Sequence, residues 1–449
     1  MTNHTTARHI SLRRPVRLLA ALAVALPVAG LSSLAVAQQQ GGGQQGGQQG
    51  GQQGGQQQQT VQAQVLTERA FKQLSEAYKF LEAEQYAQAA PILDRLLQDD
   101  KLTPFERATV LQTRAQTYVG LENFPKAAEL FEQALKLNIL PPDQQLSLTY
   151  NLAQIYAGTE QYKKAIAKFE EWFAKANNPQ PQAYLAFANA LFNEGRVRDA
   201  IPKVETAIKI ADQPKREWYD FLVGLYYENK EMPKVATVLE LLAGKYPQEA
   251  RYFRQLAGVY GELNRERDML AVTEVAYKAG HLQKSEEIVQ LAQLWMFFDN
   301  PDRAARLLER HLKDGKVANK KENWELLANA YIGSRDINKS IDPLTKAAEL
   351  SSDGEGFLRL AQAYLERENW QQAYSALENA IQKGGLKNRG QAYLLEGVAL
   401  FNLDRLADAR RAFQEASKSQ EQQRVARQWV GHIDKMMQEE AARQEAAAQ

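Results

Sequence analysis

A small or apolar residue recurs along this chain at intervals of 33 to 38 residues, and this period constrains the fold more than any other feature. Alanine fills seven of the ten positions, which are Ala89, Ala127, Ala165, Ala200, Val235, Met269, Ala304, Ser340, Ala373 and Ala409. Such a period is typical of helical arrays, in which each unit buries its apolar face against its neighbours. We therefore predict an all-α solenoid of about ten helix–turn–helix repeats, a fold class that usually binds partners rather than transforming them.

The same apolar pattern surrounds each of these positions. Trp324 is followed by Leu327, Ala328 and Tyr331, which reads W-x-x-L-A-x-x-Y and forms one apolar stripe on a helix. A second helix then carries Ala-x-x-x-Phe, as in the stretch from Ala165 to Phe169. On these motifs the chain resembles the tetratricopeptide repeat (TPR) family over residues 66–417. The resemblance implies a TPR α-solenoid, a right-handed superhelix of paired helices.

Turn-forming residues fall where the helices of this pattern should end. The corners inside the pairs are marked by Gly195, Asn229, Asn264, Asn300 and Asp336. Glycines at the expected helix C-caps between pairs are Gly244, Gly280, Gly315 and Gly384 with Gly385. No segment shows the sustained two-residue alternation of a strand, so no sheet is predicted.

The first 37 residues have the features of a secretory signal peptide. Four arginines precede an apolar run from Leu18 to Leu26, and Ala35-Val36-Ala37 is a typical cleavage site. An uncleaved membrane anchor is the alternative, but Pro27 interrupts the apolar run. We expect cleavage before Gln38 and a periplasmic location. Because the chain has no cysteine, a lipoprotein anchor is not expected.

Composition divides the rest of the chain into three parts. Residues 38–59 are almost entirely Gln and Gly, which predicts a disordered linker. Residues 60–419 form the predicted TPR array. Residues 420–449 are predicted to form a C-terminal capping helix, because Val425, Trp429 and Ile433 share one helical face. The end of this helix, beyond Met437, loses the apolar stripe and is expected to fray.

The chain offers little for catalysis. The 55 basic residues nearly balance the 54 acidic ones, so we predict no nucleic-acid partner and no anionic membrane surface. The absence of cysteine excludes thiol catalysis and cysteine zinc sites, and neither an H-E-x-x-H motif nor a P-loop occurs. His311 is expected to pack at a helix interface. We therefore predict no enzyme activity, no cofactor and no metal site.

What remains is a surface on the first helix of each pair. Residues three before, one after and four after its small residue (such as Ala153) form a second face beside the buried stripe. In TPR arrays this face lines a concave groove, and its amides and aromatics suit a bound peptide. The predicted protein-binding residues are Tyr150, Gln154, Asn189, Phe192, Tyr227, Arg254, Met296, Asn329 and Phe401. The alternative is that they only pack neighbouring repeats.

A narrower resemblance rests on short stretches such as Phe169-Glu-Glu-Trp172-Phe173 and Gly384-Gly-Leu-Lys-Asn388. These stretches resemble periplasmic TPR proteins encoded beside TonB–ExbB–ExbD energy-transduction systems. The resemblance implies a scaffold with TonB, ExbB or ExbD as partners, without a membrane span after signal cleavage. A scaffold for envelope assembly, in polysaccharide secretion, outer-membrane protein maturation or cell-wall synthesis, is the alternative. An enzyme with an unrecognised site is a third.

Overall fold

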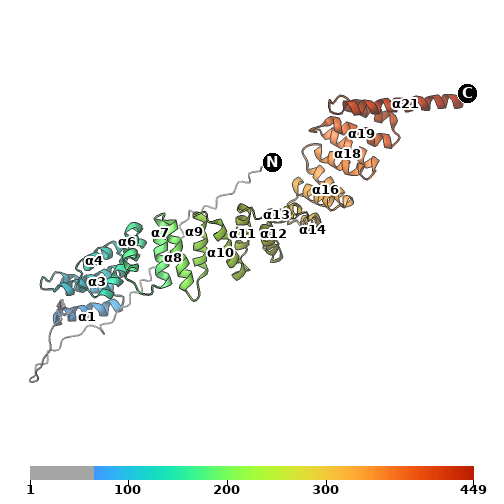
Figure 1. Ribbon diagram of the computed structural model, residues 1–449. Helices are drawn as coiled ribbons and strands as arrows, with labels where there is room; N and C mark the ends of the chain where they lie inside the picture. Colours follow the sequence, from blue (N-terminus) through green and yellow to red (C-terminus); the bar gives the residue numbers. More distant parts are fainter. Residues whose placement is uncertain (1–64, 449) are drawn as a thin grey trace, which may run out of the picture. The chain divides into compact units, whose positions relative to one another are not determined.

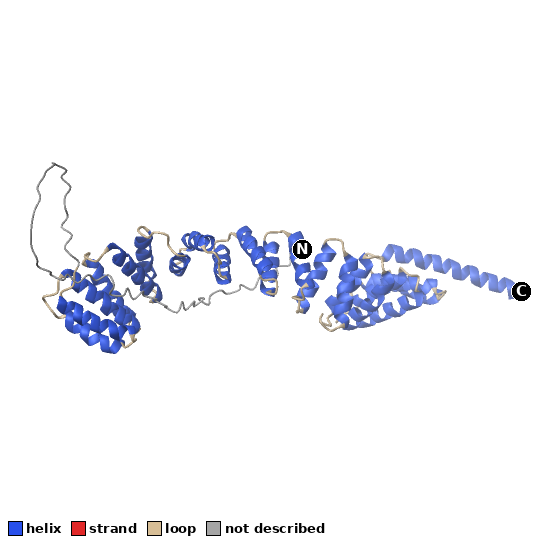
Figure 2. Ribbon diagram, turned by 90° about the horizontal axis from the view of Figure 1, so that it is seen from below, coloured by secondary structure: helices blue, strands red, loops and turns tan. Residues whose placement is uncertain are grey.

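A computed structural model describes residues 65–448, and over this range the chain consists of 21 α-helices without a strand (Figures 1 and 2). This confirms the all-α prediction. The predicted signal peptide and the Gln/Gly linker lie outside the described residues. The described residues form two compact units, with the boundary between Glu231 and Met232.

The first unit is a stack of antiparallel helix pairs followed by one further helix. Its helices are α1 (Glu68–Glu82), α2 (Tyr86–Leu97), α3 (Pro104–Gly120), α4 (Phe124–Lys136), α5 (Pro142–Gly158), α6 (Tyr162–Phe173), α7 (Pro181–Asn193), α8 (Val197–Ile210) and α9 (Arg216–Glu228). Each pair also packs against the next, as α2 does against α3.

The second unit repeats the same arrangement and ends in a longer helix. Its helices are α10 (Met232–Lys245), α11 (Ala250–Glu262), α12 (Glu266–Lys278), α13 (Ser285–Phe297), α14 (Pro301–Lys313), α15 (Lys321–Gly333), α16 (Ile337–Leu350), α17 (Glu355–Leu365), α18 (Trp370–Lys383), α19 (Arg389–Asn402), α20 (Leu406–Ala416) and α21 (Gln423–Ala448).

The periodic residues of the sequence form the core of both units. Ala165 and Phe169 of α6 are completely buried, and so are Leu152 and Ala153 of the preceding helix. Only Met269 among the ten periodic positions is half-buried rather than buried. A side chain larger than these would separate helices that are packed at the density of a protein interior. The TPR α-solenoid that the spacing predicted is therefore the observed fold.

All five residues that were predicted to mark the corners inside the pairs lie between the two helices of a pair. Gly195 and Asn264 adopt the left-handed conformation themselves, whereas in the other three corners a neighbouring residue does so: Lys230, Asp299 or Arg335. Glutamate takes this role at several further corners, Glu160 among them. The prediction for Gly244 is wrong, since this residue lies inside the last turn of α10.

One hydrogen bond recurs between successive repeats and was not predicted. The hydroxyl of Tyr260 on α11 donates to the carboxylate of Glu240 on α10 at 2.6 Å. Equivalent bonds join Tyr156 to Glu132, Tyr226 to Glu205, Trp295 to Glu274 and Tyr331 to Glu309. Burial and the nearby carboxylate raise the pKa of Tyr260 to about 12, so its hydroxyl remains a donor at physiological pH. The aromatic residue of the motif thus fills the core and also fixes the register of adjacent repeats.

The C-terminal helix α21 caps the second unit. Ala426 and Ile433 are fully buried, and the indole of Trp429 stacks on the ring of Phe413 with centroids 5.2 Å apart. The helix runs without interruption to Ala448, so the fraying predicted beyond Met437 is not observed, and its C-terminal end extends past the rest of the unit (Figure 1). Within residues 65–448 no helix combines the length and the hydrophobicity needed to cross a lipid bilayer.

Candidate protein-binding surface

The first helix of each pair carries the predicted surface residues, and the fold holds them beside the buried stripe. Leu152 and Ala153 on α5 face the core of the first unit. Gln154, the next residue, therefore lies at the edge of that core and is half-buried. The same relation places Asn189 beside Ala188 on α7 and Asn329 beside Ala328 on α15. The spacing rule therefore selects comparable positions in both units.

In the first unit several of these residues are already engaged in packing. The ring centroid of Tyr150 lies 4.7 Å from that of Trp172. Burial raises the pKa of the Tyr150 hydroxyl, although a hydrogen bond with Gln154 acts in the opposite direction. Asn189 accepts a hydrogen bond from Asn193 at 2.7 Å. These contacts leave Tyr150 with a role in packing its own repeat.

The aromatic residues at the end of α7 and α9 differ in exposure. Phe192 packs edge-to-face against Phe221, with ring centroids 5.7 Å apart, and is half-buried. Tyr227 keeps 43% of its surface exposed. Of these two, Tyr227 offers more area to a partner.

In the second unit two of the predicted residues contact the first helix of the next pair. Arg254 lies 3.7 Å from the carboxylate of Glu287 on the next first helix. Asn329 accepts a hydrogen bond from Arg359 at 2.7 Å, and Met296 is half-buried. These residues lie on α11, α13 and α15, where ion pairs and hydrogen bonds join neighbouring helices.

Phe401 is less accessible than its sequence position suggested. Its ring lies 5.0 Å from the indole of Trp429, and both belong to the cluster that α21 closes. Phe401 therefore packs under the capping helix. No sequence pattern could show this, because the contact depends on where α21 docks.

Sequence reasoning missed two exposed hydrophobic residues on the first helices of the second unit. Ile332 on α15 is 42% exposed, although the spacing rule that selects Met296 also selects it. Phe297, the residue after Met296, is 71% exposed at the end of α13. Solvent exposure of a phenylalanine to this extent is a common mark of an interaction surface when it adjoins other apolar residues.

The described residues contain no grouping of three or more His, Cys, Asp or Glu side chains that could hold a metal ion. His311 is buried, and its Nε2 atom lies 3.0 Å from the Tyr277 hydroxyl. Its Nδ1 atom is buried without a hydrogen-bond partner, and burial lowers the pKa of the imidazole. His311 thus packs between α12 and α14 as a neutral side chain, the role expected from its position.

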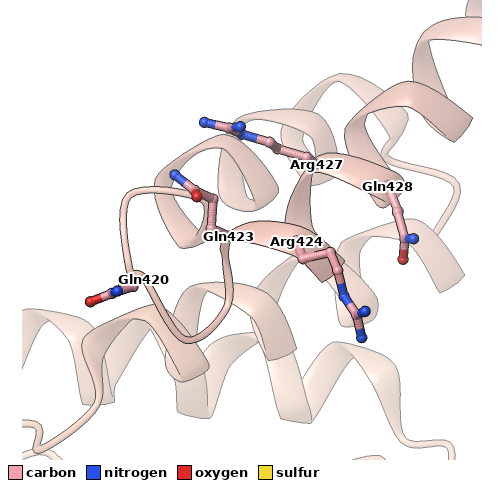
Figure 3. Close-up of a pocket in the computed structure, with 5 residues that line it drawn as sticks. All are labelled: Gln420, Gln423, Arg424, Arg427 and Gln428. Atoms are coloured by element: carbon pink, nitrogen blue, oxygen red, sulfur yellow. The ribbon is translucent and has the colours of Figure 1, made fainter.

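A surface depression near the start of α21 is lined by guanidinium and amide groups (Figure 3). Its residues are Gln420, Gln423, Arg424, Arg427 and Gln428. The two arginines are exposed and their side chains point away from one another in Figure 3. This depression therefore lacks the convergent polar groups of a small-molecule site.

Comparisons with known proteins agree with the architecture. The sequence profile of the tetratricopeptide repeat family matches residues 113–181 and 358–423. Comparison with curated proteins finds no match. The two matched stretches lie in different units, and the same two-helix repeat is observed in both.

The solved structures that resemble the chain have low sequence identity to it. The MamA protein is 17% identical over 39% of this chain and 94% of its own, with a TM-score of 0.33. A tetratricopeptide repeat protein from Parabacteroides merdae is 12% identical over 59% of this chain and 99% of its own, with a TM-score of 0.35. YrrB, described as a TPR protein with an unusual peptide-binding site, is 14% identical over 42% and 96%, with a TM-score of 0.34.

Proposed function

We propose that this tetratricopeptide-repeat protein is a periplasmic scaffold that binds another protein through the first helices of its repeats. The observation that carries the proposal is the exposed apolar and amide surface of α13 and α15, where Gln293, Phe297 and Ile332 are all exposed. Exposed hydrophobic side chains gain free energy when a partner removes them from water. Amide side chains beside them can hydrogen-bond a peptide backbone.

The proposed partner is a component of a TonB–ExbB–ExbD energy-transduction system. Support for this comes from the resemblance of short stretches to TPR proteins encoded beside such systems, and from the export signal expected in residues 1–37. In this role the protein would hold a transport component in place, and the chemistry of energy transduction would belong to that component.

Site-specific photo-crosslinking in the envelope of a Gram-negative host tests the proposal. The full chain would carry a benzoylphenylalanine at position 293 on α13, and in a matched control at position 310, since Arg310 on α14 is also exposed. We expect a protein adduct from position 293 only, identified by mass spectrometry as a TonB-system component. Adducts with polysaccharide-secretion or cell-wall proteins would exclude the TonB assignment, and the absence of any adduct would contradict the scaffold function.

A further inference from the structure

Five exposed lysines gather at one edge of the second unit, where the loop from α12 to α13 meets the loop from α14 to α15. The Tyr277 hydroxyl lies 3.0 Å from Nε2 of His311, which joins α12 to α14. The backbone N–H of Ala318 donates to Oγ of Ser285 at 3.0 Å, which joins the second loop to α13. Each lysine lies within two residues of one of these four residues. We call the group the lysine edge, and its members are Lys278, Lys284, Lys313, Lys316 and Lys320.

The charges of the lysine edge are not neutralised inside the protein. In the described part of the chain, no carboxylate pairs with any of the five lysines. The nearby Asp314 pairs with Arg310 on α14, at 3.9 Å. Glu286 and Glu322 are also exposed here and offset two of the five positive charges, which leaves an excess of three.

This positive charge acts on the protein interior. Burial lowers the pKa of the His311 imidazole, and the charges of Lys316 and Arg310 lower it further, whereas Asp314 acts in the opposite direction. The carboxylates of the unit therefore leave a positive potential at this edge.

The loop from α14 to α15 is held in one conformation by its own contacts. Val317 is 2% exposed, and its N–H donates to the carbonyl of His311 at 2.9 Å. The side-chain amide of Asn323 donates to the carbonyl of Ala318 at 2.8 Å. These contacts fix the loop backbone, so a partner that binds its lysines does not have to order it.

The start of α15 adds backbone donors for an anion. Helix α13 has a carboxylate of its own at this place, since Glu287 accepts from the N–H groups of Gln283 and Lys284 at 3.0 and 3.2 Å. The equivalent residue of α15 is Asn323, and no side chain caps the start of this helix. The first N–H groups of α15 therefore favour an anion supplied from outside.

The side chains around these lysines favour an acidic protein segment over a lipid surface. Leu282 and Val317, the large apolar residues of the two loops, are buried, so the edge has no large apolar side chain to insert into a bilayer. Asn319 accepts from the indole of Trp324 at 2.6 Å through Oδ1, so its Nδ2 group remains a donor. Ammonium and amide donors together match the carboxylate and backbone oxygen atoms of an extended acidic segment.

We propose that the lysine edge binds an acidic segment of a partner protein. Its carboxylates would lie on Lys284, Lys316 and Lys320 and at the start of α15, and the remaining lysines would add to the positive field that attracts it. This surface is separate from the one used in the proposed function, because Phe297 and Ile332 lie at the other ends of α13 and α15, about 16–18 Å along the helices. The inference therefore goes beyond the proposed function and does not depend on it.

Peptides that differ only in charge test the chemistry. Three fluorescein-labelled peptides of equal length would alternate Gly-Ser pairs with Glu, Gln or Lys. Fluorescence anisotropy with the mature chain, beginning at Gln38, is expected to show binding of the glutamate peptide alone. Raising NaCl from a low to a physiological concentration should weaken this binding roughly tenfold, because exposed ion pairs are screened by salt. Failure of the glutamate peptide to bind, or equal binding of the glutamine peptide, would contradict the inference.

Two double variants locate the binding site. Lys316→Gln with Lys320→Gln is expected to weaken binding of the glutamate peptide about fivefold, the size expected for two exposed ion pairs. Lys339→Gln with Lys346→Gln is the control, since it removes the same charge from lysines of the same unit that are paired with carboxylates. Circular dichroism would verify that both variants are folded. Equal weakening by the two variants would mean that only net charge matters and would exclude this site.

Vesicles distinguish a lipid surface from an acidic protein segment. The mature chain would be sedimented with vesicles of phosphatidylglycerol and phosphatidylethanolamine at physiological salt. We expect it to stay in the supernatant, in the original form and in the double variant Lys316→Gln with Lys320→Gln alike. Sedimentation of the original chain that this variant abolishes would assign the lysine edge to a membrane and refute the proposed partner.

Discussion

At the scale of single residues, one repeat has a glutamate where other repeats have a buried leucine. Glu396 on α19 occupies the position that Leu152 fills on α5 and Leu327 fills on α15, where leucine is buried. Burial, followed by the charge of Glu378, raises the pKa of Glu396 from 4.5 to about 7. The folded unit therefore holds a proton that the unfolded chain releases at lower pH.

This difference predicts how stability depends on pH. A carboxyl whose pKa is raised by folding destabilises the fold progressively as the pH rises from about 4.5 to about 7. Glu396→Gln removes the titration, so we expect it to stabilise the second unit by about 1–2 kcal/mol at pH 8 and much less at pH 5. Urea denaturation at both pH values measures this. Glu366→Gln, at an exposed position, is the control and should show no such difference.

At the scale of helices and corners, glutamate in the left-handed conformation is a source of strain. Glu160 has φ = 60° at the corner between α5 and α6, and its backbone N–H donates to Ala157. This conformation costs a residue with a Cβ atom about 1–2 kcal/mol, a cost that glycine does not have. We predict that Glu160→Gly stabilises the first unit by about 1 kcal/mol, measured as a higher urea midpoint. The same change at Glu170, inside α6, should destabilise it by a similar amount.

The buried residues of the repeats were easier to predict from the sequence than the corner residues or the cover over Phe401. The buried stripe of Leu327, Ala328 and Tyr331 was predictable because every repeat solves the same packing problem with the same residues. The left-handed corner residues were less predictable, because Lys230 and Glu160 have no preference for that conformation and are held there by the helices around them. Phe401 fitted the surface pattern, and only the docking of α21 shows that it is covered.

The candidate surface could also be predicted only in part from the sequence. Helical spacing correctly separates residues that face the core from those at its edge, so Asn329 and Met296 could be selected. Spacing does not show how much of each side chain its neighbours cover. That depends on the size of residues one repeat away, which is why the exposure of Phe297 and Ile332 became evident only in the folded structure.

At the scale of the whole molecule, a repeat array should respond to damage locally. Each repeat contacts mainly its neighbours, so stability is close to a sum of repeat and interface contributions. Tyr331 is nearly buried on α15 and bonds to Glu309 on α14, and therefore supports both its own repeat and the preceding one. Tyr331→Ala removes the ring and leaves Glu309 without this donor, which should cost about 3–5 kcal/mol.

Native-state hydrogen exchange distinguishes a local response from a global one. In Tyr331→Ala we expect amide protection to fall in α13 to α17, while α1 to α8 keep their wild-type protection. Ile332→Ala is the control on the neighbouring residue, and its exposed side chain should leave protection nearly unchanged. Uniform loss of protection across both units would mean that the chain unfolds as one cooperative body. A local response would mean that the surface of α13 and α15 can be altered without unfolding the repeats of the first unit.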